Sequence, residues 1–230
     1  MQKINIAIDG FSSCGKSTIA KALAKTFNYI FVDTGAMYRA VTLFAIRNEC
    51  FDEKVLDAQK LIQLLDQIEI GFEYNSQHGK SDTILNGENV EQEIRGMEVS
   101  SRVSPVATVK EVREKLVAQQ QKIGEKGGVV MDGRDIGTVV FPKAELKLFI
   151  TASLKVRVER RYQELLQKGK HVTYEEVENN LSERDKIDTE REVDPLKQAE
   201  DAVLIDNSNL TQEEQMTMIE ALARLRMLNA

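Results

Sequence analysis

The chain has 230 residues, of which 42% are hydrophobic and 30% charged, and it carries a formal net charge of −6. This length and composition are typical of a globular protein with a sizeable core. The acidic balance argues against a general nucleic-acid-binding protein, which is usually basic, and no apolar stretch approaches the ~18 residues of a membrane span. The two cysteines form no disulfide framework and the first residues resemble a strand rather than a signal peptide, so we expect a cytoplasmic protein.

An apolar run at residues 3–9 predicts the first strand, and a phosphate-binding pattern follows it directly. Gly10, Gly15, Lys16 and Ser17 occupy the fixed positions of G-x-x-x-x-G-K-[ST]. The two glycines permit backbone angles that let successive N–H groups point at phosphate oxygens. Lys16 adds a positive charge for the outer phosphates, and the Ser17 hydroxyl can reach Mg²⁺.

The segment after this loop predicts a helix over residues 17–27. Ile19, Leu23 and Phe27 are spaced i, i+4, i+8 and form one apolar face. The loop therefore leads into a helix N-terminus, which attracts anions. We expect the loop to bind the phosphates of ATP through the following residues: Gly10, Ser12, Ser13, Cys14, Gly15, Lys16, Ser17 and Thr18.

Four further apolar runs predict strands at residues 29–34, 128–132, 145–151 and 202–206. Their hydrophobicity is mostly continuous, which is typical of strands buried on both faces, and helical stretches separate them. This alternation predicts an α/β fold with a five-stranded parallel sheet and helices on both faces. Ligands of such sheets bind at the carboxyl ends of the strands, so we expect the polar strand ends to face the site: Asp9, Asp33, Asp132 and Asp206.

An α+β insertion interrupts the predicted parallel sheet. Residues 68–74 alternate between apolar and polar side chains, which predicts a half-buried antiparallel strand. Asn86-Gly87 lies between two short strand-like runs and is a strong hairpin signal.

Residues 153–195 are expected to be helical and are densely charged. Arg157, Arg160 and Arg161 are spaced i, i+3, i+4 and lie on one helix face. Two interpretations remain for these arginines: ion pairs with glutamates on a solvated face, or a cationic cluster beside the phosphate loop.

The phosphate loop identifies a nucleoside triphosphate but not a reaction. The chain lacks the N-K-x-D sequence with which GTPases recognise guanine. A small kinase must also bind a second, anionic substrate, which requires further cations near the loop. Arg39 and Arg134 each follow a predicted strand end, behind an aspartate and a glycine, and two such arginines favour phosphate binding over surface ion pairs.

Four segments together resemble the bacterial type of cytidylate kinase. They are GFSSCGKST (10–18), DTGAMYR (33–39), DGRDIGTVVFP (132–142) and ERDKIDTEREVDPL (183–196). The resemblance implies phosphoryl transfer from ATP to CMP, and to dCMP, on the nucleoside monophosphate kinase fold, with Mg²⁺ as cofactor. It further implies a core at residues 1–36, 102–152 and 192–230, a monophosphate-binding domain at 37–101 and a helical lid at 153–191.

The resemblance also implies roles for individual residues. Lys16, Asp132, Arg134 and Arg191 would be catalytic, with Mg²⁺ near Ser17. Beyond the loop, Arg157 and Arg161 would bind ATP. The CMP-binding residues would be Thr34, Gly35, Arg39, Ser104, Arg113, Asp135, Arg184, Asp188 and Arg191. Among these, Ser104, Arg113 and Asp135 would recognise cytosine, whose amine is a donor and whose ring nitrogen and carbonyl are acceptors.

The chain departs from the family pattern in the loop and the lid. Phe11 stands where proline is common, Ser13-Cys14 where Gly-Ala is frequent, and Ile187 where a lid arginine can occur. Cys14 has two interpretations: a thiol activated by the helix N-terminus and Lys16, or a small buried side chain that is inert.

Two alternative functions remain open from the sequence. One is a P-loop kinase of another small acceptor, and the other is a non-catalytic ATP-binding switch. We expect a monomer that binds ATP and CMP or dCMP, with neither a nucleic acid nor a membrane as partner.

Overall fold

The computed structural model describes residues 2–75 and 80–229. The chain divides into two compact units, which we call the sheet unit and the hairpin unit. The sheet unit comprises Met1–Asp33 and Gln119–Ala230, and the hairpin unit comprises Thr34–Ala118. The predicted core, monophosphate-binding domain and lid are defined by what each part binds. This division stays a prediction, because the two compact units are defined only by contacts within the chain.

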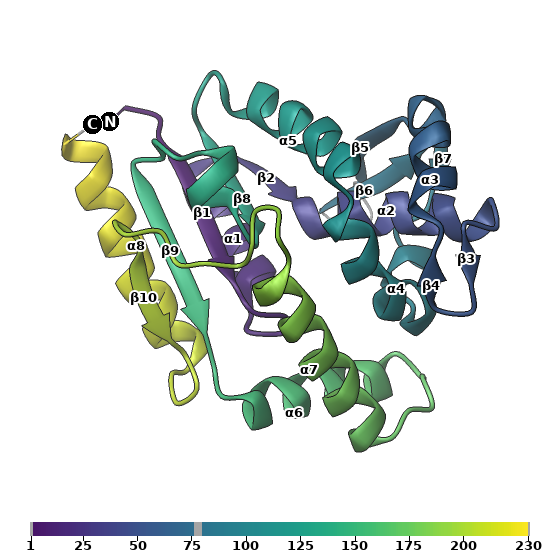
Figure 1. Cartoon of the computed structure of the whole chain (residues 1–230). Helices are drawn as coiled ribbons and strands as arrows, with labels where there is room; N and C mark the ends of the chain where they lie inside the picture. The colour runs from purple at the N-terminus through teal and green to yellow at the C-terminus, as the bar shows by residue number, and fades with distance from the viewer. Residues whose placement is uncertain (1, 76–79, 230) are drawn as a thin grey trace. The chain divides into compact units, whose positions relative to one another are not determined.

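The sheet unit holds a five-stranded parallel sheet in the order β10-β9-β1-β8-β2 (Figure 1). This confirms the predicted α/β fold, and each strand lies where the sequence indicates. Thr34, predicted as the last residue of the second strand, instead begins a helix. The strands are β1 (Asn5–Gly10), β2 (Ile30–Asp33), β8 (Val129–Gly133), β9 (Leu146–Thr151) and β10 (Val203–Asp206).

Two helices, α1 (Lys16–Phe27) and α8 (Gln212–Asn229), pack on one face of this sheet. Ile6 and Ile8 of β1 share a buried cluster with Leu23 of α1 and Ile219 of α8. Each such side chain contributes roughly 1.5–3 kcal/mol when fully buried. The π-helical turn η3 (Ile136–Val140) contacts β1 and β8. The core therefore fixes β1 and α1, the two elements that the phosphate loop connects.

The charged region expected to be helical forms two helices, α6 (Leu154–Gln167) and α7 (Tyr174–Glu190), which pack against each other. The region is not continuous, because Gly169 has φ of 69° and ends the first helix. A capping box at Thr173 and Glu176 starts the second helix. The helices α6 and α7 both belong to the sheet unit, as the phosphate loop does.

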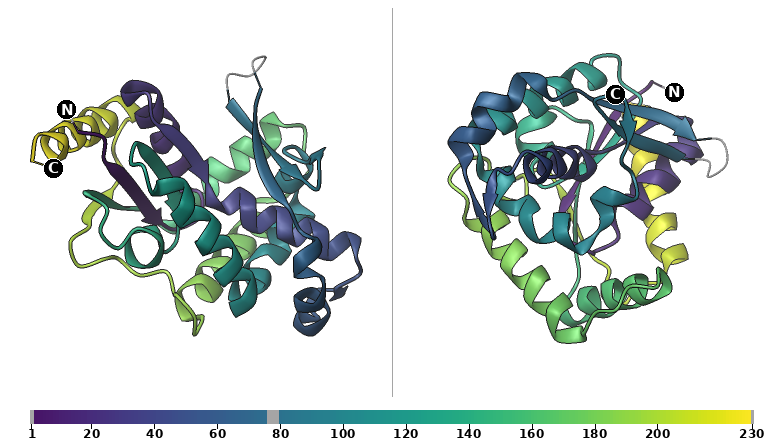
Figure 2. Two further views of the ribbon diagram at one scale, coloured as in Figure 1. Left: turned by 90° about the horizontal axis from the view of Figure 1, so that it is seen from above. Right: turned by 90° about the vertical axis from the view of Figure 1, so that its right-hand side faces the viewer.

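The hairpin unit confirms the predicted α+β insertion. Its long hairpin pairs β5 (Ile70–Asn75) with β6 (Lys80–Leu85), which turns at Asn86-Gly87 into β7 (Glu88–Asn89), and its strands appear blue in Figure 2. The sequence did not predict the small hairpin of β3 and β4 or the helix α3. The remaining elements are α2 (Thr34–Arg47), β3 (Phe51–Asp52), β4 (Val55–Leu56), α3 (Ala58–Leu64), η1 (Leu65–Gln67), η2 (Glu93–Arg95), α4 (Met97–Thr108) and α5 (Lys110–Gly124), within which the unit boundary falls.

Among the residues that the structure describes, no helix has the length and apolarity needed to span a membrane.

Candidate active site

The phosphate loop leaves β1 and enters α1 through backbone conformations that require glycine at two positions. Gly10 has φ of 143°, and a Cβ there would lie 1.9 Å from the Ile150 carbonyl oxygen. Gly15 has φ of 89° immediately before α1 begins at Lys16. A side chain at either position would strain the backbone or displace β9. The loop is thus held tightly between strand and helix, as the sequence predicts.

Side chains of the sheet unit bind the carbonyl groups of this loop. Lys16 Nζ donates to the Phe11 carbonyl at 2.6 Å, and Arg157 Nη1 donates to the Ser12 carbonyl at 3.3 Å. In a trans peptide the C=O and the following N–H point in opposite directions. Each of these bonds therefore fixes the direction of the N–H group that follows the bonded carbonyl, and such loop N–H groups can donate to an anion.

The thiol of Cys14 is buried, with 1% of the residue exposed. Its Sγ donates to the carbonyls of Phe11 at 3.0 Å and Ile150 at 3.3 Å and lies 3.7 Å from Lys16 Nζ. The structure favours the second interpretation of Cys14, a small buried side chain.

Phe11, which replaces the common proline, packs edge-on against Phe149 with ring centroids 6.1 Å apart. The guanidinium of Arg157 lies 5.1 Å from the Phe11 ring centroid, within cation–π range. Phe11 therefore links the loop to β9 and α6.

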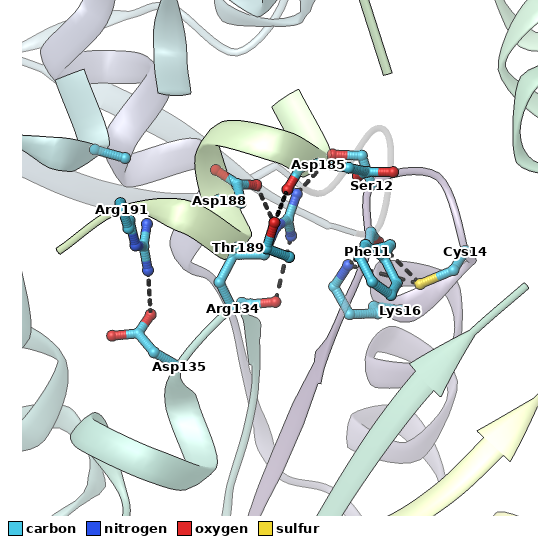
Figure 3. A network of polar contacts seen from close by, with 12 residues as sticks. Phe11, Ser12, Cys14, Lys16, Arg134, Asp135, Asp185, Asp188, Thr189 and Arg191 are labelled. Carbon is cyan, nitrogen blue, oxygen red and sulfur yellow. Dashed lines mark hydrogen bonds and ion pairs between the residues drawn. The ribbon is translucent and has the colours of Figure 1, made fainter. Parts of the chain in front are cut away.

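Arginines from three segments of the sheet unit pair with aspartates near the loop, and Figure 3 shows two of them, Arg134 and Arg191. Arg134, directly after β8, pairs with Asp188 of α7 at 2.8 Å and donates to Ser12 Oγ at 2.7 Å. Two further ion pairs join Arg157 of α6 to Asp185 of α7 at 2.6 Å and Arg191 to Asp135 at 3.6 Å.

Burial makes the charges in this cluster costly unless opposite charges meet them. Burial, and then repulsion by Arg134, lowers the pKa of Arg184 to about 10. Burial alone would raise the pKa of Asp188, but Arg134 and Arg184 hold it below its usual value. Phosphate groups bind arginine side chains in the same way as the carboxylates that pair with them here. A buried cluster of this composition beside a phosphate loop is suited to a second phosphorylated ligand.

The residues present fit a bound Mg²⁺ at the base of the loop. Ser17 Oγ donates to Asp132 Oδ2 at 2.6 Å, and Asp33 is the register partner of Asp132 on the neighbouring strand. Burial, and then repulsion by Asp33, raises the pKa of Asp132 to about 6. A divalent cation would relieve this repulsion. Mg²⁺ commonly takes one or two carboxylates together with substrate phosphates and water. Among the described residues, no group of three or more His, Cys, Asp or Glu is arranged to hold a metal ion.

The predicted base- and monophosphate-binding residues fall into both units. Ser104 on α4 and Arg113 on α5 are buried in the hairpin unit, and the Arg113 guanidinium lies 5.7 Å from the Tyr38 ring centroid. Arg39 of α2 is half-buried. Several of the predicted residues of the sheet unit contact one another in the pairs described above, whereas a common site with the residues of the hairpin unit stays a prediction. The members in the hairpin unit are Thr34, Gly35, Arg39, Ser104 and Arg113.

Residues 6–225 match the family model of cytidylate kinase. The chain belongs to the cytidylate kinase family. It is 55% identical over 221 residues to the cytidylate kinase of Bacteroides fragilis strain ATCC 25285, with 96% of each chain covered. It is 57% identical over 219 residues to that of Flavobacterium johnsoniae and 56% identical over 215 residues to that of Bacteroides thetaiotaomicron, with 95% and 94% of each chain covered respectively. The family resemblance inferred from the four motifs is confirmed.

The ATP-binding roles of Arg161 and Thr18 stay predictions. The side chain of Arg161 is 15% exposed and pairs with Glu164 at 2.9 Å, and Thr18 is exposed in the first turn of α1. Asp206 ends β10 as predicted, whereas its role in the site stays a prediction. Its exposed carboxylate accepts from both the Ser208 hydroxyl and the Ser208 amide.

Asp9 was also expected to face the site, and the structure shows what its carboxylate bonds. Its carboxylate accepts from the backbone N–H groups of Ile136 at 2.8 Å and Gly137 at 2.7 Å. These amides follow Asp135 directly in the chain, so Asp9 holds the segment that carries Arg134 and Asp135. Burial raises the pKa of Asp9 to about 7, against the lowering effect of the two backbone hydrogen bonds.

We expect the stability of the protein to fall as the pH rises from about 4 to about 7, partly because of Asp9. The folded state binds the Asp9 proton more tightly than the unfolded state, whose pKa is near 3.8, so the free energy of unfolding decreases with pH in this window. The slope from one such group reaches about 1.4 kcal/mol per pH unit.

Urea unfolding of the wild type and of Asp9→Asn at several pH values measures this contribution. Asn cannot titrate, so the free energy of unfolding of the variant should depend less steeply on pH than that of the wild type. Asp132 titrates in both proteins and cancels from the comparison. Parallel slopes would contradict the raised pKa of Asp9.

Sequence reasoning missed two residues that organise this site, Asp185 and Asn207. Asp185 lies within the fourth family motif without an assigned role, and the structure shows it as the partner of Arg157. Asn207 follows β10 and reaches the phosphate loop. Only the position of Asn207 at the end of a predicted strand could have indicated this contact.

Proposed function

We propose that this chain transfers the terminal phosphoryl group of ATP to CMP, and to dCMP, giving ADP and the nucleoside diphosphate. The observation that carries the proposal is the cluster of buried and half-buried arginines beside the phosphate loop, each next to a carboxylate that a phosphate can replace. Relatives 55–57% identical that bear the name cytidylate kinase support the choice of acceptor. We further propose a cytoplasmic monomer.

Phosphoryl transfer requires little covalent chemistry from the protein, because the transition state is loose and highly charged. Catalysis is therefore positioning together with charge stabilisation. Lys16 and the loop N–H groups would hold the ATP phosphates, and Arg134 and Arg191 would bind the transferred group and the acceptor phosphate. Ser17 and Asp132 would hold Mg²⁺, which supplies positive charge to the phosphate oxygens when bound. Arg157 keeps the loop in place through the Ser12 carbonyl.

A transfer assay with ATP and each of CMP, dCMP, UMP, AMP and GMP tests this function, with ATP hydrolysis in the absence of acceptor as the baseline. The proposal expects CDP and dCDP as the main products and slow hydrolysis of ATP alone. Efficient transfer to a different acceptor would favour the alternative of another small-molecule kinase. ATP binding without any transfer would favour the alternative of a non-catalytic switch.

We propose that Asp135 and Ser104 recognise the base of the acceptor nucleotide. A carboxylate and a hydroxyl can accept from the cytosine amine, whereas uracil presents a carbonyl at the same position. Asp135→Ala and Ser104→Ala should each reduce the ratio of kcat/KM for CMP to that for UMP. Each lost hydrogen bond to a buried group costs about 1–3 kcal/mol, which is roughly a 5- to 150-fold change.

Asp135→Asn is the matched variant, because asparagine offers both a donor and an acceptor. It should raise the activity with UMP above that of Asp135→Ala. Loss of Asp135 also removes the ion pair with Arg191 at 3.6 Å. This second effect should lower kcat/KM for CMP and UMP alike, so the ratio of the two values reports on recognition of the base. A CMP/UMP ratio unchanged in both alanine variants would show that neither residue recognises the base.

A further inference from the structure

The side chain of Asn207 joins three elements of the sheet unit to the phosphate loop. The residue follows β10 and is 1% exposed. Its Nδ2 donates to the Cys14 carbonyl at 2.8 Å and to Gln215 Oε1 of α8 at 3.0 Å. Arg160 of α6 donates through Nη1 to Asn207 Oδ1 at 2.9 Å and through Nη2 to its backbone carbonyl at 3.0 Å.

These partners fix which way the amide of Asn207 points. A guanidinium only donates, so the Asn207 oxygen must face Arg160, and a backbone carbonyl only accepts, so the Asn207 nitrogen must face Cys14. Both hydrogens of Nδ2 then have an acceptor. The amide thus uses both of its donors and its oxygen in a buried position, and a flip would set donor against donor and acceptor against acceptor, at the cost of unpaired buried groups.

The bond to the Cys14 carbonyl orients the peptide between Cys14 and Gly15. Because this peptide is planar and trans, the Gly15 N–H points opposite to the Cys14 carbonyl and so away from Asn207. Gly15 is the last residue before α1, where its φ of 89° places it in the left-handed region. Its N–H belongs to the loop amides that, on the proposed function, bind the phosphates of ATP.

We propose that Asn207 is a positioning residue for ATP, which holds the Gly15 N–H toward the nucleotide phosphate by bonding the Cys14 carbonyl from behind. Arg160 and Gln215 act through Asn207 by fixing its amide. This role deepens the proposed function and rests on the phosphate loop as the ATP site. It assigns Asn207 no contact with the acceptor nucleotide.

Asn207→Asp provides the test, because it keeps the size and the acceptor for Arg160 but places an acceptor opposite the Cys14 carbonyl. We expect the Kd for ATP, measured by titration without acceptor, to rise about tenfold or more. The KM for ATP should rise similarly, while the KM for CMP stays within about twofold. The matched control is Asn209→Asp, which adds the same charge at an exposed residue of the same segment and should bind ATP as the wild type does.

Arg160→Met and Gln215→Leu give an independent test if Asn207→Asp does not fold. Each variant removes one hydrogen-bond partner of the Asn207 amide. Both should therefore raise the Kd for ATP more than the Kd for CMP, although by less than Asn207→Asp does. A uniform loss of stability with ATP and CMP affinities unchanged would show a purely structural role and overturn the proposal. So would ATP affinity in all three variants equal to that of Asn209→Asp.

The experiment separates this proposal from the proposed function. If the wild type transferred phosphate to another acceptor while Asn207→Asp selectively weakened ATP, the function would be wrong and the role of Asn207 would stand. If CMP were the acceptor and Asn207→Asp bound ATP normally, the function would stand and this role would be wrong.

Discussion

Arg134→Ala should lower the turnover with saturating CMP by about a thousandfold or more, because an arginine that meets the transition-state charge contributes on this order. Arg134 follows β8 and is held by Asp188 at 2.8 Å and by Ser12 Oγ at 2.7 Å. Burial disfavours its charge, but Asp188 attracts it, and the pKa of Arg134 lies above its usual value. The guanidinium is therefore positioned and fully charged before any ligand binds.

Two comparisons separate this chemical role from a loss of structure. Arg134→Ala leaves the buried Asp188 without its ion pair to this arginine, which is destabilising, so thermal unfolding must show a folded variant at the assay temperature. Arg134→Lys keeps the charge but loses the planar fork and should fall between alanine and the wild type. Arg226→Ala, at an exposed arginine of α8, should leave turnover unchanged. Near-normal turnover of folded Arg134→Ala would remove Arg134 from the catalytic residues.

The sheet and the loop could be predicted because each follows from local sequence. A continuous apolar run such as Val129–Met131 is typical of a strand buried on both faces, and Gly10 and Gly15 have backbone angles that side chains rarely adopt. The turn at Asn86-Gly87 is likewise encoded by its own two residues. The small hairpin of β3 and β4 was missed because its strands have two residues each, too few for any periodicity.

The contacts within the site could not be predicted in the same way, because they join residues far apart in the chain. Asp9 was expected at the sheet edge that faces the ligand, yet it accepts from amides at Ile136 and Gly137. Asp185 lies beside Arg184 in sequence but pairs with Arg157, 28 residues earlier. Spacing shows which residue types are available, whereas the packing of α6 against α7 decides which of them meet. The family motifs supplied the roles that spacing alone left open.

Lys16→Ala should lower turnover about a hundred- to a thousandfold with every acceptor alike, since it acts on the ATP side of the reaction. In the structure the ammonium donates to the Phe11 carbonyl at 2.6 Å, and burial lowers the pKa of Lys16. ATP phosphates would give this buried charge stronger partners than one carbonyl oxygen. The activity ratios among CMP, dCMP and UMP should therefore stay those of the wild type, unlike the ratios in Asp135→Ala.

Lys16→Met keeps much of the length of the side chain without its charge, and Lys25→Met makes the same change at an exposed lysine of the same helix. Steady-state rates should fall severely in the first and remain normal in the second. Because Lys16 also bonds the loop at Phe11, ATP binding must be measured as well. A variant that binds ATP as the wild type does but turns over slowly would show that the charge acts mainly in the transition state. A Lys16→Met enzyme with a normal rate, or one that lost activity with CMP alone, would contradict the assignment of Lys16 to the ATP phosphates.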